Sequence, residues 1–352
     1  MKWEDNVRKV IPYVPGEQPN KENMIKLNTN ECPYPPTPNV KKAVEAFDTE
    51  KLRLYPDTNA TPLADALSDY YHVDKKQIFI GVGSDDVLAI AFMTFFNSNK
   101  KILFPDITYS FYDVWAELYR IPYQVQPLDE EFKIRREDYM IPNGGVILAN
   151  PNAPTGEQTD LATIEEIIQA NQDVVVIIDE AYIDFGGESS LPFIEKYDNV
   201  LVVQTFSKSR AMAGLRVGYA FGSEKLIQYM NDVKFSFNSY TMNLPAQVFG
   251  AEAVKDDKYF RETVQKIVHT RERVKGELRE LGFVFTDSMS NFIFATHPRC
   301  QAVELQNMLR EKSIYVRHFT KERIDNYLRI SIGTDAEMDT LLGELKAYIQ
   351  SK

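Results

Sequence analysis

The sequence has few of the residues that build metal centres and disulfide frameworks. It contains two cysteines and four histidines in 352 residues, and neither set has the spacing of metal ligands or redox pairs. Two isolated thiols suit a reducing compartment, so we expect a cytoplasmic protein. The segment Met1–Val10 is charged and lacks an apolar core, which argues against a secretory signal.

Long hydrophobic runs and excess positive charge are also missing. No apolar run reaches about 18 residues, so we expect no membrane span. The net charge of -11 argues against nucleic acid or an anionic membrane as a partner. An anionic small molecule would therefore need a local arginine cluster. The composition, 44% hydrophobic and 26% charged, is ordinary for a globular enzyme, and the length allows about two domains.

The order of apolar runs and helical segments predicts an α/β fold. Continuous Val, Ile and Leu runs alternate with helices, which favours a mostly parallel sheet with helices on both faces. After Asn243 the pattern changes to long charged helices followed by short strands, typical of an α+β module. We expect an N-terminal arm at 1–45 that packs with the small domain, a large domain at 46–245 and a small domain at 246–352. Because the arm is rich in Pro, we expect it to be extended.

Polar side chains follow the carboxyl ends of three predicted strands. Ser84 and Asp85 follow a strand and a Gly-x-Gly turn, where the free N–H groups of a starting helix form an anion site. Asp179 ends a second strand, and Lys208 follows a third. Because the carboxyl ends of parallel strands meet at one edge, we expect these residues to lie together. As an alternative, Ser84 and Asp85 could simply be N-cap residues.

The residues around Lys208 predict a site for a carbonyl compound that carries a phosphate. A lysine desolvated in such a crevice can attack a carbonyl and form a Schiff base, although Lys208 taken alone could be a surface lysine. Thr205, Ser207 and Arg216 could bind a phosphate. Asp179 would be costly at the end of a buried strand without a charged or protonated partner, which a protonated pyridine nitrogen would supply. A Schiff-base lysine, a phosphate site and a carboxylate for the ring nitrogen are what the binding of pyridoxal phosphate requires.

Other interpretations remain for some of these residues. Asp179 could bind Mg²⁺ in an NTPase, but the Gly-x-x-x-x-Gly-Lys-Ser/Thr loop is missing. Arg216 and Arg329 lie inside apolar strand patterns, where an unpaired guanidinium is costly, so we expect an anion for each.

The ordered set of motifs resembles that of the fold-type I aminotransferases, and within them the histidinol-phosphate aminotransferase family. The resemblance runs from about Val7 to the last helix. Its motifs are VRKVIPYVPGE, KLNTNECPYPPTP, LYPD, GVGSDDV, PDITYSFY, NPNAPTG, DEAYIDF, TFSKSRAMAGLRVGY, NFIF, YVRHF and YLRISIGT. It implies a homodimeric enzyme that uses pyridoxal 5'-phosphate. The reaction would move an amino group between L-histidinol phosphate and 2-oxoglutarate in histidine biosynthesis.

The resemblance also implies how the cofactor would be held. Lys208 would form the Schiff base and move the proton, Asp179 would pair with the pyridinium nitrogen, and Tyr182 would hydrogen-bond the phenolate oxygen. Tyr109 would stack on the ring, and Tyr55 would reach the phosphate from the partner subunit. The phosphate would be bound by Ser84, Asp85, Thr205, Ser207 and Arg216.

For the substrate, the resemblance assigns Arg329 to the carboxylate of the amino acid. It places Tyr13, Asn30 and Arg317 near the head group and its phosphate. As alternatives, Tyr13 and Tyr109 could be packing aromatics, and Arg317 could form a surface ion pair.

One position departs from the family pattern. Family members commonly carry an asparagine directly before Pro-Thr-Gly, and this chain has Ala153 there, with Asn152 one residue earlier. Either Asn152 contacts the cofactor through a shifted loop, or Tyr182 and water replace the missing amide.

Three other functions fit parts of the pattern. A threonine-phosphate decarboxylase shares the same arm and loops, and a broad aromatic-amino-acid aminotransferase shares the cofactor site. A catalytically silent regulator that binds the cofactor would normally carry a basic DNA-binding module, for which length and charge leave no room.

Overall fold

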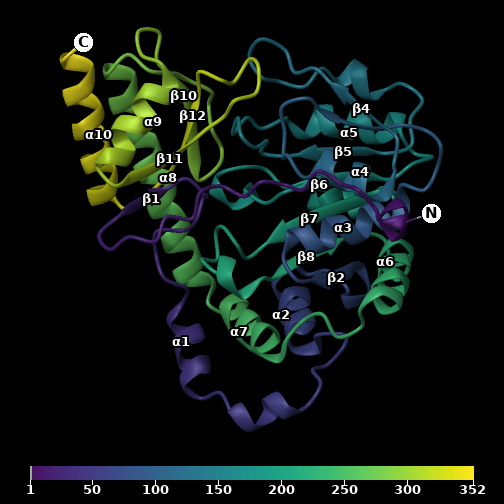
Figure 1. The fold of residues 1–352 in the computed structure, drawn as a ribbon. Coiled ribbons are helices and arrows are strands. Elements are labelled where there is room, and N and C mark those ends of the chain that lie inside the picture. The colour runs from purple at the N-terminus through teal and green to yellow at the C-terminus, as the bar shows by residue number, and fades with distance from the viewer. Residues whose placement is uncertain (1) are drawn as a thin grey trace.

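Seven strands in the order β2-β8-β7-β6-β5-β3-β4 form the central sheet of the large domain (Figure 1). They are β2 (Ile78–Gly81), β3 (Ile102–Pro105), β4 (Tyr123–Gln126), β5 (Val146–Ala149), β6 (Val176–Asp179), β7 (Val200–Thr205) and β8 (Gly218–Phe221). Every strand except β8 runs in the same direction. The computed structural model describes residues 2–352, and it confirms the predicted mostly parallel α/β sheet.

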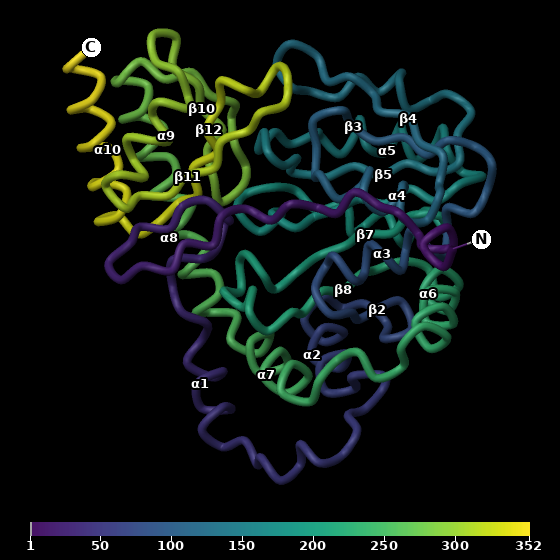
Figure 2. The backbone as a smooth tube through the Cα atoms, in the orientation of Figure 1, coloured from purple at the N-terminus to yellow at the C-terminus, as the bar shows by residue number. Residues whose placement is uncertain are grey.

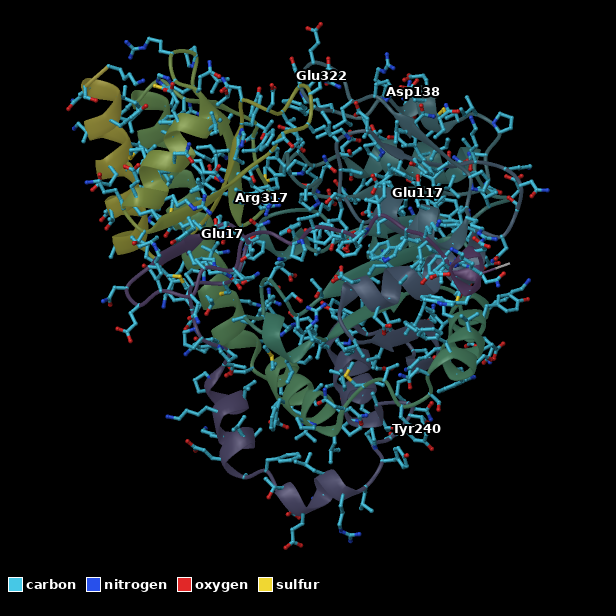
Figure 3. All side chains as sticks on the ribbon, viewed as in Figure 1. Glu17, Glu117, Asp138, Tyr240, Arg317 and Glu322 are labelled. Carbon is cyan, nitrogen blue, oxygen red and sulfur yellow. The ribbon has the colours of Figure 1, made fainter. Side chains whose placement is uncertain are left out.

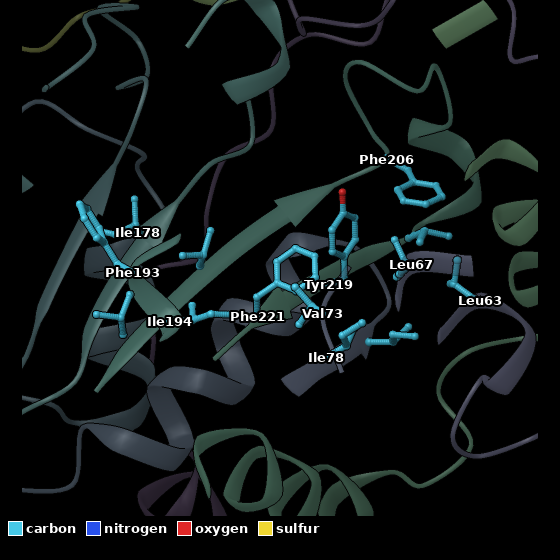
Figure 4. Packing of buried hydrophobic residues seen from close by; sticks show 14 of the residues in the cluster. Leu63, Leu67, Val73, Ile78, Ile178, Phe193, Ile194, Phe206, Tyr219 and Phe221 are labelled. Carbon is cyan, nitrogen blue, oxygen red and sulfur yellow. The ribbon is translucent and has the colours of Figure 1, made fainter. Parts of the chain in front are cut away.

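Helices bury both faces of this sheet, which explains the continuous apolar runs. In β6, Val176 and Ile178 point to one face and Ile177 to the other. The first face packs against α2 (Thr61–Tyr71), α5 (Leu161–Ala170) and α7 (Leu244–Lys255), and Figure 4 shows part of this core. The second face packs against α3 (Ser84–Phe95), α4 (Tyr112–Tyr119) and α6 (Glu224–Phe237).

A five-stranded sheet in the order β1-β11-β12-β10-β9 forms the small domain. Its strands are β1 (Ile25–Leu27), β9 (Val284–Phe285), β10 (Phe292–Thr296), β11 (Ile314–His318) and β12 (Leu328–Ser331). It packs against α8 (Asp257–Glu280), α9 (Ala302–Glu311) and α10 (Asp335–Gln350). Strand β1 comes from the N-terminal arm and pairs in parallel with β11, so the arm contributes to the small-domain sheet.

The arm crosses from the large domain to the small domain (Figure 2). Tyr13 stacks on Phe111 of the large domain at 4.1 Å between ring centroids, and Glu17 forms a 2.6 Å ion pair with Arg310 on α9. The expectation of an arm extended to residue 45 is wrong at its end, where α1 (Pro38–Glu45) forms. Thr37 caps this helix through Asn39 N–H, and proline is favourable at the first helical position.

Short 3-10 helices connect several of these elements. They are η1 (Trp3–Asn6), η2 (Thr49–Arg53), η3 (Lys75–Gln77), η4 (Arg136–Tyr139), η5 (Ile183–Phe185), η6 (Leu191–Glu195) and η7 (Ala213–Leu215). Within residues 2–352, no helix combines the length and apolar character that crossing a membrane requires.

The change from one hydrophobic core to the other takes place at Asp256. Helix α7 packs in the large-domain core, whereas α8 contributes Val264 and Ile267 to the small-domain core. The Asp256 side chain accepts a hydrogen bond from Tyr259 N–H and so caps α8. The boundaries at 45 and 245 stay predictions, and this packing favours a position near 256 for the second.

Candidate active site

A cavity of about 180 Å³ lies at the carboxyl edge of the large sheet. Sequence-predicted residues that line it are Ser84, Asp85, Tyr109, Asp179, Tyr182, Thr205, Ser207, Lys208 and Arg216. It adjoins a groove of about 670 Å³ between the two domains, which is lined by the predicted Tyr13, Asn30, Arg317 and Arg329. The strand ends therefore bring together residues that are up to about 130 positions apart in the chain, as parallel strands require.

The anion end of the cavity is the start of α3. Gly83 is the N-cap, and no side chain caps the helix, so the first N–H groups have no side-chain partner. The alternative prediction that Ser84 and Asp85 are the N-cap is wrong, because they are the first residues inside the helix. Gly218, the first residue of β8, packs directly on this turn: a Cβ there would lie 2.2 Å from the backbone carbon of Gly83.

The Arg216 side chain reaches the start of α3 from the segment that precedes β8. Because β8 is antiparallel to its neighbours, the residues before it lie at the edge where the other strands end. Its guanidinium donates to Asp85 Oδ2 at 3.2 Å and to Ser207 Oγ at 3.4 Å, and Ser207 Oγ is 3.0 Å from Thr205 Oγ1. A Cβ on Gly83 would lie 2.4 Å from Arg216 Nη2. Two hydroxyls, one guanidinium and a helix N-terminus thus surround a space suited to a phosphate.

Asp179 lies at the deep end of the cavity. The hydroxyl of Tyr112 donates to Asp179 Oδ2 at 2.9 Å, and Ala181 N–H donates to Oδ1 at 3.3 Å. Burial raises the pKa of Asp179 to about 6, and the Tyr112 hydrogen bond opposes that rise. Within residues 2–352, no basic side chain forms an ion pair with it. A buried carboxylate without a cation fits the protonated ring nitrogen of pyridoxal phosphate.

Lys208 and Tyr182 line the same cavity as this carboxylate. Lys208 Nζ donates to the backbone carbonyl of Thr29 at 3.1 Å and lies 5.7 Å from the centre of the Tyr182 ring. The Tyr182 hydroxyl accepts a hydrogen bond from Asn30 Nδ2 at 2.9 Å. Tyr109 donates to Asp85 Oδ1 at 2.7 Å, which fixes its ring at the cavity wall.

Arg317 and Arg329 both line the groove, and Figure 3 shows Arg317 at the junction of the domains. Arg329 Nη2 donates to the backbone carbonyl of Asn28 at 3.1 Å, while its buried Nε has no hydrogen-bond partner. Burial lowers the pKa of Arg329, and the neighbouring charge of Arg317 lowers it further. In the described part of the chain neither arginine is paired with a carboxylate, so the predicted alternative of a surface ion pair for Arg317 is wrong.

Two predicted residues do not line the cavity. Tyr55 is 82% exposed and packs against Tyr240, which Figure 3 shows at the lower edge of the large domain, away from Arg317 in this view. Asn152 is buried behind the wall, where its amide donates to the Ile107 carbonyl at 2.9 Å and to Thr155 Oγ1 at 2.9 Å. Ala153 lines the cavity at this point, so the geometry does not support a cofactor contact from Asn152.

Sequence reasoning missed two contributors. Tyr112 is fully buried and donates to Asp179, and its position three residues after Tyr109 in PDITYSFY was a usable signal. Thr29 contributes only a backbone carbonyl, which no sequence pattern identifies.

Fold and site together define an enzyme of the pyridoxal-phosphate-dependent type, with a phosphate site, a lysine and a buried carboxylate in one cavity. Residues 22–345 match the model of the family described as aminotransferase class I and II. The chain belongs to this family, whose members use pyridoxal phosphate.

Curated relatives match over the full length. The histidinol-phosphate aminotransferase of Lactococcus lactis subsp. cremoris (strain SK11) is 53% identical over 352 residues, covering 100% of this chain and 99% of the relative. The enzyme of the same name from Clostridium beijerinckii is 51% identical over 349 residues, covering 99% and 98%. Among solved structures, the histidinol-phosphate aminotransferase from Clostridium acetobutylicum has a TM-score of 0.86 at 23% identity, covering 94% of this chain and 100% of that one. At that identity the structure supports the fold alone.

Proposed function

We propose that this chain catalyses the transfer of an amino group between L-histidinol phosphate and 2-oxoglutarate, which yields imidazole acetol phosphate and glutamate in histidine biosynthesis. The main support for this proposal is the sequence identity, above 50% over the full length, to curated relatives of that name. The site supports it independently, because a lysine and a buried carboxylate line a cavity that adjoins a groove with two arginines that form no ion pair with a carboxylate in the described residues.

The cavity has a place for each part of pyridoxal phosphate. Arg216, Ser207, Thr205 and the start of α3 would hold the phosphate, and Asp179 would hold the ring nitrogen. Tyr109 and Tyr182 would contact the ring and its oxygen. When bound, the cofactor supplies an electron sink for the carbon that carries the amino group.

The protein's own groups would then manage the proton and the substrate. Lys208, which lines the same cavity as Asp179 and donates to the Thr29 carbonyl, would move the proton at the amino-bearing carbon. Arg329 would bind a substrate carboxylate, and Arg317 would bind the phosphate of the amine, because guanidinium groups match both anions. One groove with two unpaired cations suits a phosphorylated amine and a dicarboxylate in turn.

We also propose a cytoplasmic homodimer with shared sites. Tyr55 does not line the cavity of its own chain and is exposed, as are the nearby apolar side chains Leu52 and Leu54. Such a patch is typical of an interface. In a dimer this segment would place Tyr55 at the cofactor phosphate bound by the partner subunit.

The experiment is a transamination assay with purified, cofactor-loaded protein. We expect glutamate to form only when both histidinol phosphate and 2-oxoglutarate are consumed, and we expect Lys208→Ala to abolish this. Turnover of threonine phosphate with release of carbon dioxide would favour a decarboxylase instead. Preference for phenylalanine would favour a broad aromatic aminotransferase. Cofactor binding without any turnover would favour a silent regulator.

A further inference from the structure

Three consecutive residues of the N-terminal arm each contact a different functional side chain. The Asn28 carbonyl accepts from Arg329 at 3.1 Å, and the Thr29 carbonyl accepts from Lys208 Nζ at 3.1 Å. The Asn30 amide donates to the Tyr182 hydroxyl at 2.9 Å. We propose that the segment Asn28–Asn30 positions these groups relative to one another, and that Asn30 acts on the reaction by orienting Tyr182. This inference rests on the proposed function.

The surroundings of Asn30 argue against direct contact with the substrate. It was predicted to lie near the substrate head group, and although it borders the groove the residue is only 1% exposed. Its N–H donates to Ser331 Oγ at 2.9 Å, and its side-chain oxygen accepts from the same hydroxyl at 2.9 Å. Its carbonyl accepts from Asn291 Nδ2 at 3.0 Å. With these groups occupied, the amide nitrogen is fixed toward Tyr182.

The bond from Asn30 determines what the Tyr182 hydroxyl can do. Because this oxygen already accepts a hydrogen bond from Asn30, its own hydrogen is free to be donated toward the cavity. The Tyr182 ring is held separately, since it packs edge-on against Phe292 at 5.1 Å with an interplanar angle of 90°. Ring and hydroxyl are therefore both fixed, and when the cofactor is bound the hydroxyl would be available as a donor to its phenolate oxygen.

The segment also connects the two domains. Strand β1 ends at Leu27 and is paired with β11, so Asn28–Asn30 continues directly from the small-domain sheet. Ser331 and Asn291 belong to that same domain, whereas Tyr182 and Lys208 belong to the large domain. A shift of the small domain would thus be transmitted to Tyr182 and Lys208 through these three adjacent residues, and to the Tyr182 ring also through Phe292 of β10.

Asn30→Gly tests the role of the side chain with little change to the backbone. Asn30 has a φ of +56°, which glycine adopts freely, so the two backbone hydrogen bonds can persist. Asn23 also has a positive φ, of +57°, and is exposed outside the site, so Asn23→Gly is the matched control. Asn30→Asp is a second variant, which keeps the size of the side chain and removes the amide donor.

The measurements are kcat, KM and the pH titration of the visible spectrum of the cofactor-loaded protein. For Asn30→Gly we expect kcat to fall about tenfold, as for other supporting residues, with KM changing less than about threefold. Loss of an oriented donor to the phenolate oxygen would raise the midpoint pH of the spectral transition by roughly half to one unit. Asn23→Gly should match the wild type in all three.

A double-mutant cycle with Tyr182→Phe decides whether Asn30 acts through Tyr182. In that background, Asn30→Gly should lower kcat by less than about twofold, because the hydroxyl it orients is gone. A tenfold loss of kcat on adding Asn30→Gly to Tyr182→Phe would overturn the inference. So would a spectral midpoint pH and a kcat equal to those of the wild type in both Asn30 variants. If wild-type protein transaminates normally in that case, the proposed function stands; absence of turnover in wild-type protein would instead refute the function itself.

Discussion

Arg317 and Arg329 are direct partners across the antiparallel strands β11 and β12, so their side chains share one face of the small-domain sheet. Both line the groove above the cavity, and neither forms an ion pair within residues 2–352. Two adjacent guanidinium groups repel each other unless anions lie between or beside them. We therefore propose that the pair binds two anionic groups of a substrate.

This pair leads to a prediction about substrate preference. Arg317→Ala should raise the KM for histidinol phosphate about 10- to 100-fold, the value of one or two charged hydrogen bonds, and should affect glutamate less. Arg329→Lys should weaken the binding of both 2-oxoglutarate and glutamate, because the lysine ammonium lacks the forked geometry that matches a carboxylate. Steady-state kinetics in both directions measure this. Equal losses for both substrates in Arg317→Ala would contradict separate roles for the two arginines.

The hydrogen bond from Tyr112 to Asp179 predicts a shift in pH dependence. Burial already raises the pKa of Asp179 to about 6, and the Tyr112 donor holds that pKa down. Tyr112→Phe should therefore raise the pKa further, so that the carboxylate becomes protonated at a higher pH and the acid limit of cofactor affinity moves upward. Cofactor titrations of the cofactor-free protein from pH 5 to 8 measure it. Tyr119→Phe, on the same helix, is the control, and an unchanged acid limit in Tyr112→Phe would refute the role of the bond.

Asp179 also predicts a stability effect in the cofactor-free protein. Its pKa in the folded state is above its ordinary value of 3.8, so the folded state binds its proton more tightly than the unfolded state does. Its contribution to stability therefore falls as pH rises from about 4 to about 6 and stays low above. Asp179→Asn should stabilise the cofactor-free protein at pH 7.5 by roughly 2–3 kcal/mol. Thermal melting measures this, and a destabilised variant would show that the buried charge has an unrecognised partner.

The contact between Gly218 and the turn before α3 predicts a steric requirement. A Cβ on Gly218 would lie 2.2 Å from the backbone of Gly83, so Gly218→Ala must push β8 away from the anion site. We expect a loss of at least about 2 kcal/mol in stability and a cofactor affinity at least about tenfold weaker. Gly214→Ala in the preceding 3-10 helix η7 is the matched control, because a Cβ there meets nothing within 4 Å. Comparable losses in both variants would show that the close approach at Gly218 is not the cause.

Shared active sites predict complementation between inactive chains. Tyr55→Ala and Lys208→Ala homodimers should both have low activity, but a mixed dimer would contain one site with both residues intact. Refolding the two variants together should restore up to about a quarter of the wild-type activity, because random pairing makes half of the dimers mixed and each has one of its two sites intact. No recovery, with dimers confirmed by sedimentation, would contradict the role of Tyr55.

Much of the cavity could be predicted because its residues follow strands that the sequence marks clearly. Asp179 and Lys208 come at the ends of apolar runs, and their meeting follows from parallel strand order. Arg216 could be placed only by its motif, because nothing local indicates that β8 runs antiparallel. The bond between Asn30 and Tyr182 joins residues 152 positions apart and depends on how the arm crosses the domains. Asn152 and Ala153 are neighbours in the sequence, and only the backbone geometry determines that Ala153 rather than Asn152 faces the cavity.

The most direct measurement is the visible spectrum of the cofactor-loaded protein during sequential addition of the two substrates. Histidinol phosphate should abolish the absorption band of the lysine-bound cofactor, and 2-oxoglutarate should restore it, with one glutamate formed for each cycle. Lys208→Ala protein should not show this recovery. A band that responds to threonine phosphate or phenylalanine but not to histidinol phosphate would contradict the proposed reaction. Failure of wild-type protein to form the band would contradict the site itself.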